Sequence, residues 1–186
     1  MSYYPKVIGT KCYLSPMRAE DAPVYTKWFN DLEVQRSCVI PVPVITLEAE
    51  QEWIANAAQQ GDVVFAIVDA AEHRLIGNTG LHRIEPLNRT AELGIVIGEK
   101  DCWDKGYGSE ATLLMLDYGF NVLNLHSVML RAYAFNERAL ACYRKCGFRE
   151  IGRRREAKVI AGRCWDEIYM DILDSELESP YVKKLF

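Results

Sequence analysis

The sequence predicts an α/β (α+β) fold in which a mixed, mostly antiparallel central sheet is flanked by helices. Short runs rich in β-branched and aromatic residues recur along the 186-residue chain and are separated by polar turns, as strands are. Between them lie segments whose apolar residues recur at the spacing of a helix. Strands and helices that follow one another in this way are typical of layered α/β and α+β domains.

The first third of the chain is expected to form one strand and two helices, at 6–15, 19–30 and 47–59. Acidic residues and Pro23 in its first turn support the first helix, because proline is tolerated there. The stretch 38–45 contains two prolines and cannot be a regular element. Thr46 can cap the second helix, and Gly61 ends it.

Three strand-like runs come next, joined by short polar turns, at 63–69, 74–84 and 90–98. Because these turns are short, we expect an antiparallel meander. The remaining segments are a long helix, a strand, a short helix and two strands, at 107–123, 126–134, 137–146, 148–160 and 163–173. We expect a single domain over 1–186, with 174–186 as a C-terminal tail.

Composition excludes several classes of protein. The net charge is −4, whereas binding of nucleic acid favours a basic surface, so we expect no nucleic-acid partner. No apolar run approaches the roughly 20 residues of a membrane span, and the N-terminus lacks the apolar core of a signal peptide. We therefore expect a cytoplasmic protein without a membrane partner. The apolar end of the tail suggests docking on a neighbouring copy, as in a homodimer.

The six cysteines predict reduced thiols rather than disulfides, because no secretion signal precedes them and their spacing is irregular. Cys142 and Cys146 share a helix face, yet no nearby histidine pair completes a set of zinc ligands. We therefore expect no metal site.

The segment "WDKGYGSEA" (103–111) is the first candidate for chemistry. Gly106 and Gly108 lie between a strand and a helix. The first amides of a helix have no intrahelical partner, and glycine lets a phosphate approach them. The spacing is compatible both with a phosphate-binding loop and with a simple turn.

Two familiar phosphate loops do not fit this segment. The Gly-Lys-Ser/Thr of a Walker loop is absent. "GYGSEA" matches the dinucleotide pattern GxGxxA, but seven residues separate it from Gly98 and the expected acid about 20 residues later is missing. A nicotinamide-dependent oxidoreductase is therefore disfavoured.

Two segments of the chain resemble the GCN5-related N-acetyltransferase (GNAT) superfamily. "AELGIVIGEKDCWDKGYGSEA" (91–111) is similar to its acetyl-CoA motif, and "LRAYAFNERALACYRKCGF" (130–148) is similar to its second motif. The order of elements also fits from end to end. The chain looks like the branch that holds ribosomal-protein N-terminal acetyltransferases and spermidine acetyltransferases. The resemblance implies a GNAT-like sheet and acetyl-CoA as co-substrate.

Two positions depart from the family pattern. Trp103 stands where the family usually has Gln or Arg, and Asp104 stands where glycine is often found. The backbone of the loop does not depend on either side chain. An acid beside a pyrophosphate is unfavourable unless it points away, so Asp104 counts against the assignment.

By resemblance, the backbone of the strand pairs with the pantetheine arm and the glycine loop holds the pyrophosphate. Asn136, Ala139 and Tyr143 share one helix face, and in the GNAT pattern that face meets the cofactor. The implied cofactor-binding residues are Ile95, Val96, Ile97, Trp103, Lys105, Gly106, Tyr107, Gly108, Ser109, Asn136, Ala139 and Tyr143. Asn136 is equally well a plain helix N-cap.

Acetyl transfer from a thioester to an amine needs a base, an oxyanion donor and an acid. Glu92 is the candidate base, since apolar neighbours would raise a carboxyl pKa; the alternative is a solvated or ion-paired strand glutamate. A backbone N–H near Val96 or Ile97 is the candidate oxyanion donor. The resemblance places Tyr143 at the sulfur as general acid, and the alternative is a core aromatic.

Substrate contacts are less well defined. Trp28 and the 36–45 loop are candidates, because early helices line the acceptor pocket in the family, and His82 and Glu92 are further candidates. The predicted function is direct transfer of an acetyl group to a primary amine in a ternary complex, the acceptor being a protein N-terminus, a polyamine or another small amine. The alternative is a non-catalytic acyl-CoA-binding or regulatory module of the same fold.

Overall fold

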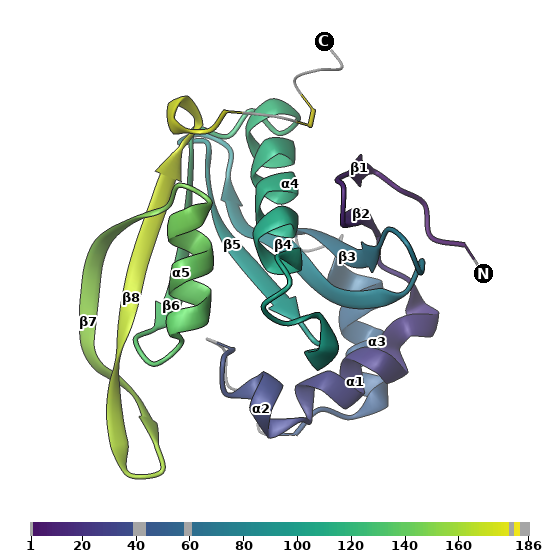
Figure 1. Cartoon of the computed structure of the whole chain (residues 1–186), viewed down its shortest axis with the longest axis horizontal. Helices are drawn as coiled ribbons and strands as arrows, with labels where there is room; N and C mark the ends of the chain where they lie inside the picture. Colours follow the sequence, from purple (N-terminus) through teal and green to yellow (C-terminus); the bar gives the residue numbers. More distant parts are fainter. Residues whose placement is uncertain (1, 39–43, 58–60, 179–180, 183–186) are drawn as a thin grey trace.

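The computed structural model describes residues 2–38, 44–57, 61–178 and 181–182. In these ranges the strands form one mixed sheet in the order β1-β2-β3-β4-β5-β6-β8-β7 (Figure 1). The strands are β1 (Val7–Ile8), β2 (Cys12–Pro16), β3 (Val63–Asp69), β4 (Leu75–Glu85), β5 (Thr90–Ile97), β6 (Ser127–Tyr133), β7 (Arg149–Ile160) and β8 (Arg163–Leu173). The predicted mostly antiparallel sheet flanked by helices is confirmed.

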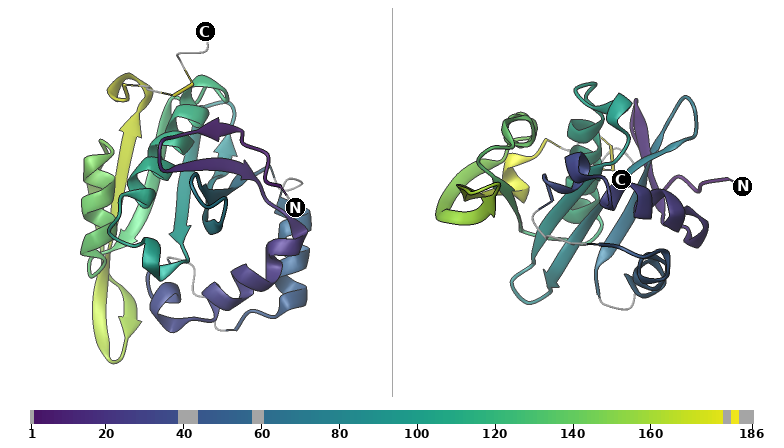
Figure 2. Two further views of the ribbon diagram at one scale, coloured as in Figure 1. Left: turned by 45° about the vertical axis from the view of Figure 1, so that its right-hand side comes forward. Right: turned by 90° about the horizontal axis from the view of Figure 1, so that it is seen from below.

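Helices cover both faces of this sheet. They are α1 (Ala22–Phe29), α2 (Leu32–Gln35), α3 (Leu47–Asn56), α4 (Tyr107–Asn121) and α5 (Glu137–Lys145). In both Figure 1 and Figure 2 (left), α1, α2 and α3 gather at the lower end of the molecule, whereas α5 lies beside β8. None of the helices in the described ranges is long and apolar enough to cross a membrane.

The two faces of the sheet pack into separate apolar clusters because successive strand residues point to opposite sides. On β3, Ile67 joins the cluster under α4 and α5, while Ala66 and Val68 join the cluster under α1. On β5, Leu93 faces α4 and Val96 faces the α1 side. This alternation fixes which side chains of β5 reach each face.

One pair of strands interrupts the antiparallel order. β5 and β6 run parallel and are paired only from Thr90 to Glu92, opposite Ser127 to Met129. Beyond Glu92, β5 stays on β4 and β6 stays on β8, as far as Ile97 and Tyr133 respectively. The sheet therefore divides in the middle, and the backbone of β5 after Glu92 has one edge without a strand partner.

The N-terminal strand predicted at 6–15 is wrong in one respect, because the chain folds back within it. β1 and β2 form an antiparallel hairpin around a turn at Gly9. The carboxylate of Glu110 accepts the amides of Thr10, Lys11 and Cys12 at 2.9, 2.6 and 2.8 Å. A long-range contact with α4 therefore creates a turn that local sequence does not announce.

Other boundaries shift by small amounts. The helix predicted at 19–30 begins as a 3₁₀ turn, Ala19–Asp21, before α1, and the short helix α2 was not predicted. Thr46 caps α3 as expected, with its hydroxyl 3.2 Å from the amide of Ala49. Much of the predicted irregular stretch 38–45, and the end of the helix predicted at 47–59, lie outside the described residues. All six cysteines are free thiols.

Candidate active site

A cavity of about 360 Å³ lies where the sheet divides. Four segments line it: the chain after α2, the end of β5, the loop into α4, and α5. Among the predicted cofactor-binding residues, those in its wall are Ile95, Val96, Ile97, Trp103, Gly106, Gly108, Ser109, Asn136, Ala139 and Tyr143. Residues that are far apart in sequence and predicted to act together are thus brought to one cavity.

The backbone of β5 presents alternate groups to this cavity. The amide of Gly98 bonds the carbonyl of Ile76 at 2.9 Å, and Val96 is in register with Asn78. Because hydrogen-bonding direction alternates along a strand, the N–H and C=O of Val96 face β4. Those of Ile95 and Ile97 face the unpaired edge, where Trp103 Nε1 donates to the carbonyl of Ile97 at 2.8 Å.

Glycine occurs at the two positions of the loop for different physical reasons. Gly106 precedes α4 with φ = 88°, a left-handed conformation that favours glycine. Gly108 lies in the first turn of α4, and a Cβ there would meet only Cys142 Sγ and Ile97 Cγ1, both at an ordinary 3.8 Å. No described part of the protein requires glycine at 108. Because Gly108 lines the cavity, a side chain there would reduce the space inside it.

The two departures from the family pattern have structural explanations. Asp104 has φ = 59°, a left-handed conformation that Asp tolerates better than most residues. Trp103 stacks against Arg138, whose guanidinium carbon is 3.9 Å from the centre of the indole ring. Arg138 and Lys145 of α5 both line the cavity, although the sequence did not single them out. A guanidinium therefore lies beside the position where the family usually has Gln or Arg.

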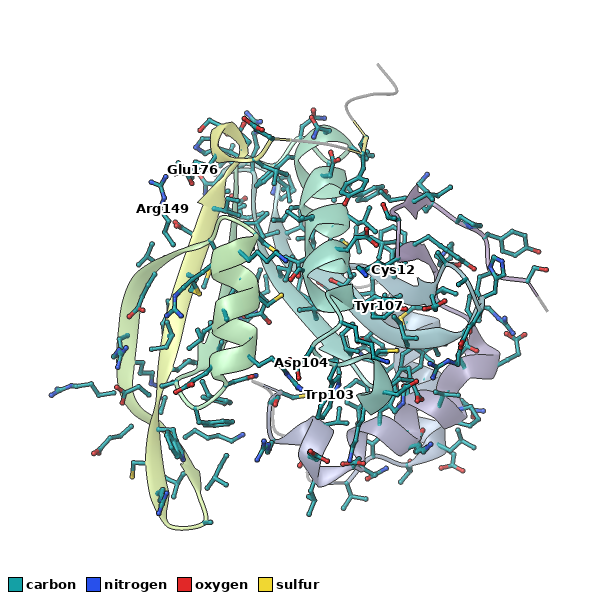
Figure 3. The ribbon with its side chains drawn as sticks, in the orientation of Figure 1. Cys12, Trp103, Asp104, Tyr107, Arg149 and Glu176 are labelled. Carbon is teal, nitrogen blue, oxygen red and sulfur yellow. The ribbon has the colours of Figure 1, made fainter. Side chains whose placement is uncertain are left out.

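Two predicted cofactor residues do not line the cavity. Lys105 and Tyr107 are absent from its wall. Tyr107 instead donates its hydroxyl to Asp69 at the end of β3, and Figure 3 places its side chain on the side of α4 away from α5. Burial opposes ionisation of Asp69, but Tyr107 and the amides of Glu72 and Ala71 outweigh it, so the Asp69 pKa is lowered. Tyr107 ties the glycine loop to the sheet.

The helix α5 presents the second motif to the cavity. Asn136 is its N-cap, and the Asn136 side chain accepts the amide of Ala139 at 3.2 Å. Tyr143 is 91% buried against Phe148 and lines the cavity. Burial raises the pKa of the Tyr143 phenol, and the neighbouring Cys142 and Cys146 raise it further. The phenol is therefore held in its protonated, hydrogen-donating form.

Glu92 does not have the apolar surroundings that were expected of it. Its two carboxylate oxygens pair with Arg131 Nε at 2.6 Å and with an Arg83 guanidinium nitrogen at 2.7 Å. Arg131 also pairs with the buried Glu167 at 3.4 Å. The expectation of apolar neighbours is wrong. The role of Glu92 as base stays a prediction, and ion pairing of both oxygens argues against it.

The predicted substrate contacts divide into three groups. Trp28 is only 3% exposed and donates to Glu99 at 2.9 Å, and a Cβ at Gly98 would overlap its ring. Trp28 therefore packs against the end of β5 and offers no surface to an acceptor. Of the 36–45 loop, Ser37 and Cys38 line the cavity, while 39–43 lie outside the described residues. His82 lies on β4 and pairs with Asp62.

The described ranges hold no group of three His, Cys, Asp or Glu side chains arranged to bind a metal ion. The cavity offers bare amides, the cations Arg138 and Lys145, and the phenol of Tyr143, and Asp104 also lies in its wall. Amides at the positive end of a helix, with nearby cations, suit phosphate groups. The unpaired edge of β5 suits an extended chain of amides. This set fits acetyl-CoA.

Comparisons with known proteins agree with this assignment. The model of the acetyltransferase (GNAT) domain matches residues 11–149. A spermidine N(1)-acetyltransferase of Vibrio cholerae is 38% identical over 112 residues, which cover 59% of this chain and 63% of that protein. YdaF of Bacillus subtilis, provisionally named a ribosomal N-acetyltransferase, is 33% identical over 104 residues, 56% of each chain.

Among solved structures, spermidine N-acetyltransferase from Vibrio cholerae in complex with CoA and spermine superposes with a TM-score of 0.82. It has 27% identity and covers 90% of this chain and 98% of its own. The family model spans well over half of the sequence and includes both motifs. The chain therefore belongs to the GNAT family of acetyltransferases and is an acetyl-CoA-dependent acetyltransferase.

Proposed function

We propose that the protein transfers an acetyl group directly from acetyl-CoA to a primary amine, with both substrates bound together. The main support is the division of the sheet after Glu92 at the cavity. The end of β5 and Tyr143 of α5 both line this cavity, and burial raises the pKa of the Tyr143 phenol. This arrangement offers hydrogen-bond donors on one side and an acid on the other.

The glycine loop and α5 are proposed to hold the phosphates of acetyl-CoA. Gly106, Gly108 and Ser109 contribute the amides at the positive end of α4. Arg138 and Lys145 lie in the same wall and contribute positive charge. We assign the pantetheine arm to the carbonyl of Ile95 and to one of the amides of Ile95 and Ile97, which face away from β4, and this leaves Val96 without this role.

Three groups are then needed for the chemistry. The attacking nitrogen must lose a proton, because an alkyl amine with a pKa near 10.4 is neutral only about once in two thousand molecules at pH 7. The carbonyl oxygen gains charge, and the amide of Ile95 or Ile97 is oriented to stabilise it. The sulfur takes a proton from Tyr143, whose burial keeps the hydroxyl protonated.

The acceptor is proposed to be an α-amine of a peptide rather than a polyamine. Carboxylates without a cation partner favour a polyamine, whereas the strand residues Glu92 and Glu167 are already paired with Arg83 and Arg131. An α-amine also has a pKa near 7.7–8.0 and is more often neutral at pH 7 than an alkyl amine. The similar proteins include a spermidine acetyltransferase and one named as a ribosomal N-acetyltransferase, so the two acceptor classes are compared directly below.

Calorimetric titration with acetyl-CoA, with NAD in parallel, tests the first part of the proposal. Micromolar binding of acetyl-CoA without NAD binding is expected. Release of free CoA is then measured with a panel of peptide α-amines, spermidine and small amines. Folded protein that does not bind acetyl-CoA would reject the assignment. Turnover with spermidine but with no peptide would reject the acceptor class alone.

Tyr143→Phe separates an enzyme from a non-catalytic acyl-CoA-binding module. The variant keeps the ring that packs against Phe148 and loses only the hydroxyl. We expect turnover to fall at least tenfold while the dissociation constant for acetyl-CoA is unchanged. Undiminished turnover would remove Tyr143 from the acid role.

The homodimer and the cytoplasmic location stay predictions.

A further inference from the structure

A histidine–carboxylate pair lies on the face of the sheet opposite α4 and α5, and the proposed function does not use it. His82 Nδ1 is 2.7 Å from Asp62 Oδ2, and both side chains are partly buried. His82 is in register with Glu92, and Gly80 is in register with Gly94 one step along the same strands. These positions share the face on which Val96 packs, because successive residues alternate sides.

The imidazole packs against the two glycines. A Cβ at Gly80 would be 3.0 Å from His82 Nε2, and a Cβ at Gly94 would be 3.2 Å from Nε2 and 3.3 Å from Cδ2. Apart from the adjacent residues of the chain, these two ring atoms are the only atoms of the described structure within 4 Å of a Cβ at Gly94. The glycine pair thus makes room for the ring, and the Nε2 end of the ring points along β5 toward Gly94.

The partner of Nδ1 determines which nitrogen is free. Asp62 Oδ2 accepts from Nδ1, and Asp62 Oδ1 accepts the backbone N–H of Arg83 at 3.2 Å. Arg83 has φ = 50° at an irregularity in the pairing of β4 with β5. This irregularity directs its amide to Asp62 and its guanidinium to Glu92. In a neutral imidazole whose Nδ1 donates to the carboxylate, Nε2 carries the lone pair.

His82 is not part of the cavity wall, but Gly94, against which Nε2 packs, lies close to the point where the sheet divides. Glu92 is the last residue of β5 paired with β6, and Gly94 is two residues further on. An amine held on the His82 face at Gly94 therefore reaches the unpaired edge of β5 from one side. Tyr143 lines the cavity from α5, which packs on the other face. Base and acid would stand on opposite sides of the opening.

Other charged groups around His82 are engaged. Asp62 faces it from the residue before β3, and Glu92 lies opposite on β5. Glu92 is ion-paired through both oxygens to Arg83 of β4 and Arg131 of β6. Imidazole is the side chain that is largely neutral near pH 7 and still basic enough to take a proton. Within the described ranges, no hydrogen-bond partner is found for His82 Nε2, so it is available to do so.

We propose that His82 is the proton acceptor for the amine and that Asp62 is its positioning residue; this proposal rests on the acetyltransferase function above. The acceptor enters as an ammonium ion and releases one proton to solvent. As nitrogen bonds the thioester carbon, its second proton passes to His82 Nε2. The carbon–sulfur bond breaks, and the sulfur takes the proton of Tyr143. His82 returns its proton to the Tyr143 phenolate through solvent, so one proton is released per amide formed.

The test begins with the wild-type protein. Acetyl-CoA affinity, turnover and the pH profile of kcat/KM are measured with an amine that the protein acetylates. His82→Asn keeps an amide N–H for Asp62 and removes Nε2. We expect kcat to fall about 10²- to 10³-fold, with loss of the acidic limb of the profile and an unchanged acetyl-CoA dissociation constant.

Two further variants make the result specific. Asp62→Asn should move the acidic limb to lower pH, because a neutral amide no longer stabilises the imidazolium; an unmoved limb would reject the positioning role. His126→Asn is the matched control, since His126 pairs with Asp174 at 3.3 Å at an exposed position and should leave turnover unchanged.

The outcomes separate the two proposals. A wild-type protein without acetyl-CoA binding or turnover rejects the acetyltransferase function, and the role of His82 falls with it. An active wild-type protein whose His82→Asn variant stays within threefold, with its acidic limb intact, overturns the His82 proposal alone. Loss of that limb in Glu92→Gln instead would return the base role to Glu92.

Discussion

The indole of Trp103 and the guanidinium of Arg138 are stacked, with 3.9 Å between the guanidinium carbon and the ring centre. Trp103 is fixed in turn by its hydrogen bond to the carbonyl of Ile97. The end of β5, the glycine loop and the first turn of α5 are thus joined through two side chains. Figure 3 shows Trp103 and Asp104 below the start of α4, on the loop that leads into it. A cation at the cavity is held in place by an aromatic ring.

Arg138→Ala should weaken acetyl-CoA binding about tenfold, because a held guanidinium contributes charge to phosphate binding. The effect should shrink at high salt, since salt screens such interactions. Arg144→Ala is the matched control, as Arg144 is exposed on the same helix and does not line the cavity. Calorimetric titration at two salt concentrations checks this, and equal losses in the two variants would contradict it.

Gly108→Ala should bind acetyl-CoA at least tenfold more weakly without losing stability. The added methyl group meets only ordinary contacts in the protein, and alanine is the better helix former by about 1 kcal/mol. Its effect should therefore appear only when the cavity is filled. Gly152→Ala, where the Cβ meets open space, is the control. Thermal melts with and without acetyl-CoA measure both quantities, and wild-type affinity in Gly108→Ala would show that the loop does not approach the ligand.

Tyr107→Phe should lower both stability and acetyl-CoA affinity, although Tyr107 does not line the cavity. The variant leaves Asp69 with its amide partners but without the hydroxyl, which we expect to cost about 1–3 kcal/mol. The first turn of α4 loses its tether to β3. Tyr118→Phe keeps the edge-to-face packing with Phe65 and serves as control. Denaturant unfolding and calorimetry test the two effects, and unchanged affinity would limit Tyr107 to a structural role.

Glu50 should make the protein less stable as pH rises. It is 96% buried in α3, its Oε1 lacks a hydrogen-bond partner among the described residues, and burial raises its pKa to about 7. Because the folded pKa is raised, the stabilisation is complete below the unfolded value near 4.3 and is lost as pH rises through about 7. The loss is at most roughly 3 kcal/mol.

Glu50→Gln should remove this dependence and melt at a higher temperature than the wild type at pH 8. Glu48→Gln, at an exposed position of the same helix, should behave like the wild type. Melting temperatures from pH 5 to 8.5 provide the measurement. If the melting temperature of the wild type does not fall as pH rises over this range, Glu50 is not buried as a carboxylic acid.

Much of the fold follows from local pattern. β3 spans Val63–Asp69 as predicted, because its apolar run is bounded by turns. Asn136, Ala139 and Tyr143 were expected on one helix face, and all three line the cavity. The same periodicity would have indicated Cys142, which is three residues after Ala139. Arg138 and Lys145 lie off this face, and no periodic pattern separates them from solvated charges.

The sequence by itself predicted the order of most elements, the glycine loop, and the α5 face that Asn136, Ala139 and Tyr143 share, and the family resemblance assigned that face to the cofactor. These features depend on the spacing of residues that are close together in the sequence. Only the tertiary structure decided that Glu92 is ion-paired to Arg83 and Arg131, and that Asp62 orients His82 over Gly80 and Gly94. Charge pairing and proton transfer depend on distances of a few ångströms between residues from different strands, and strand pairing sets those distances.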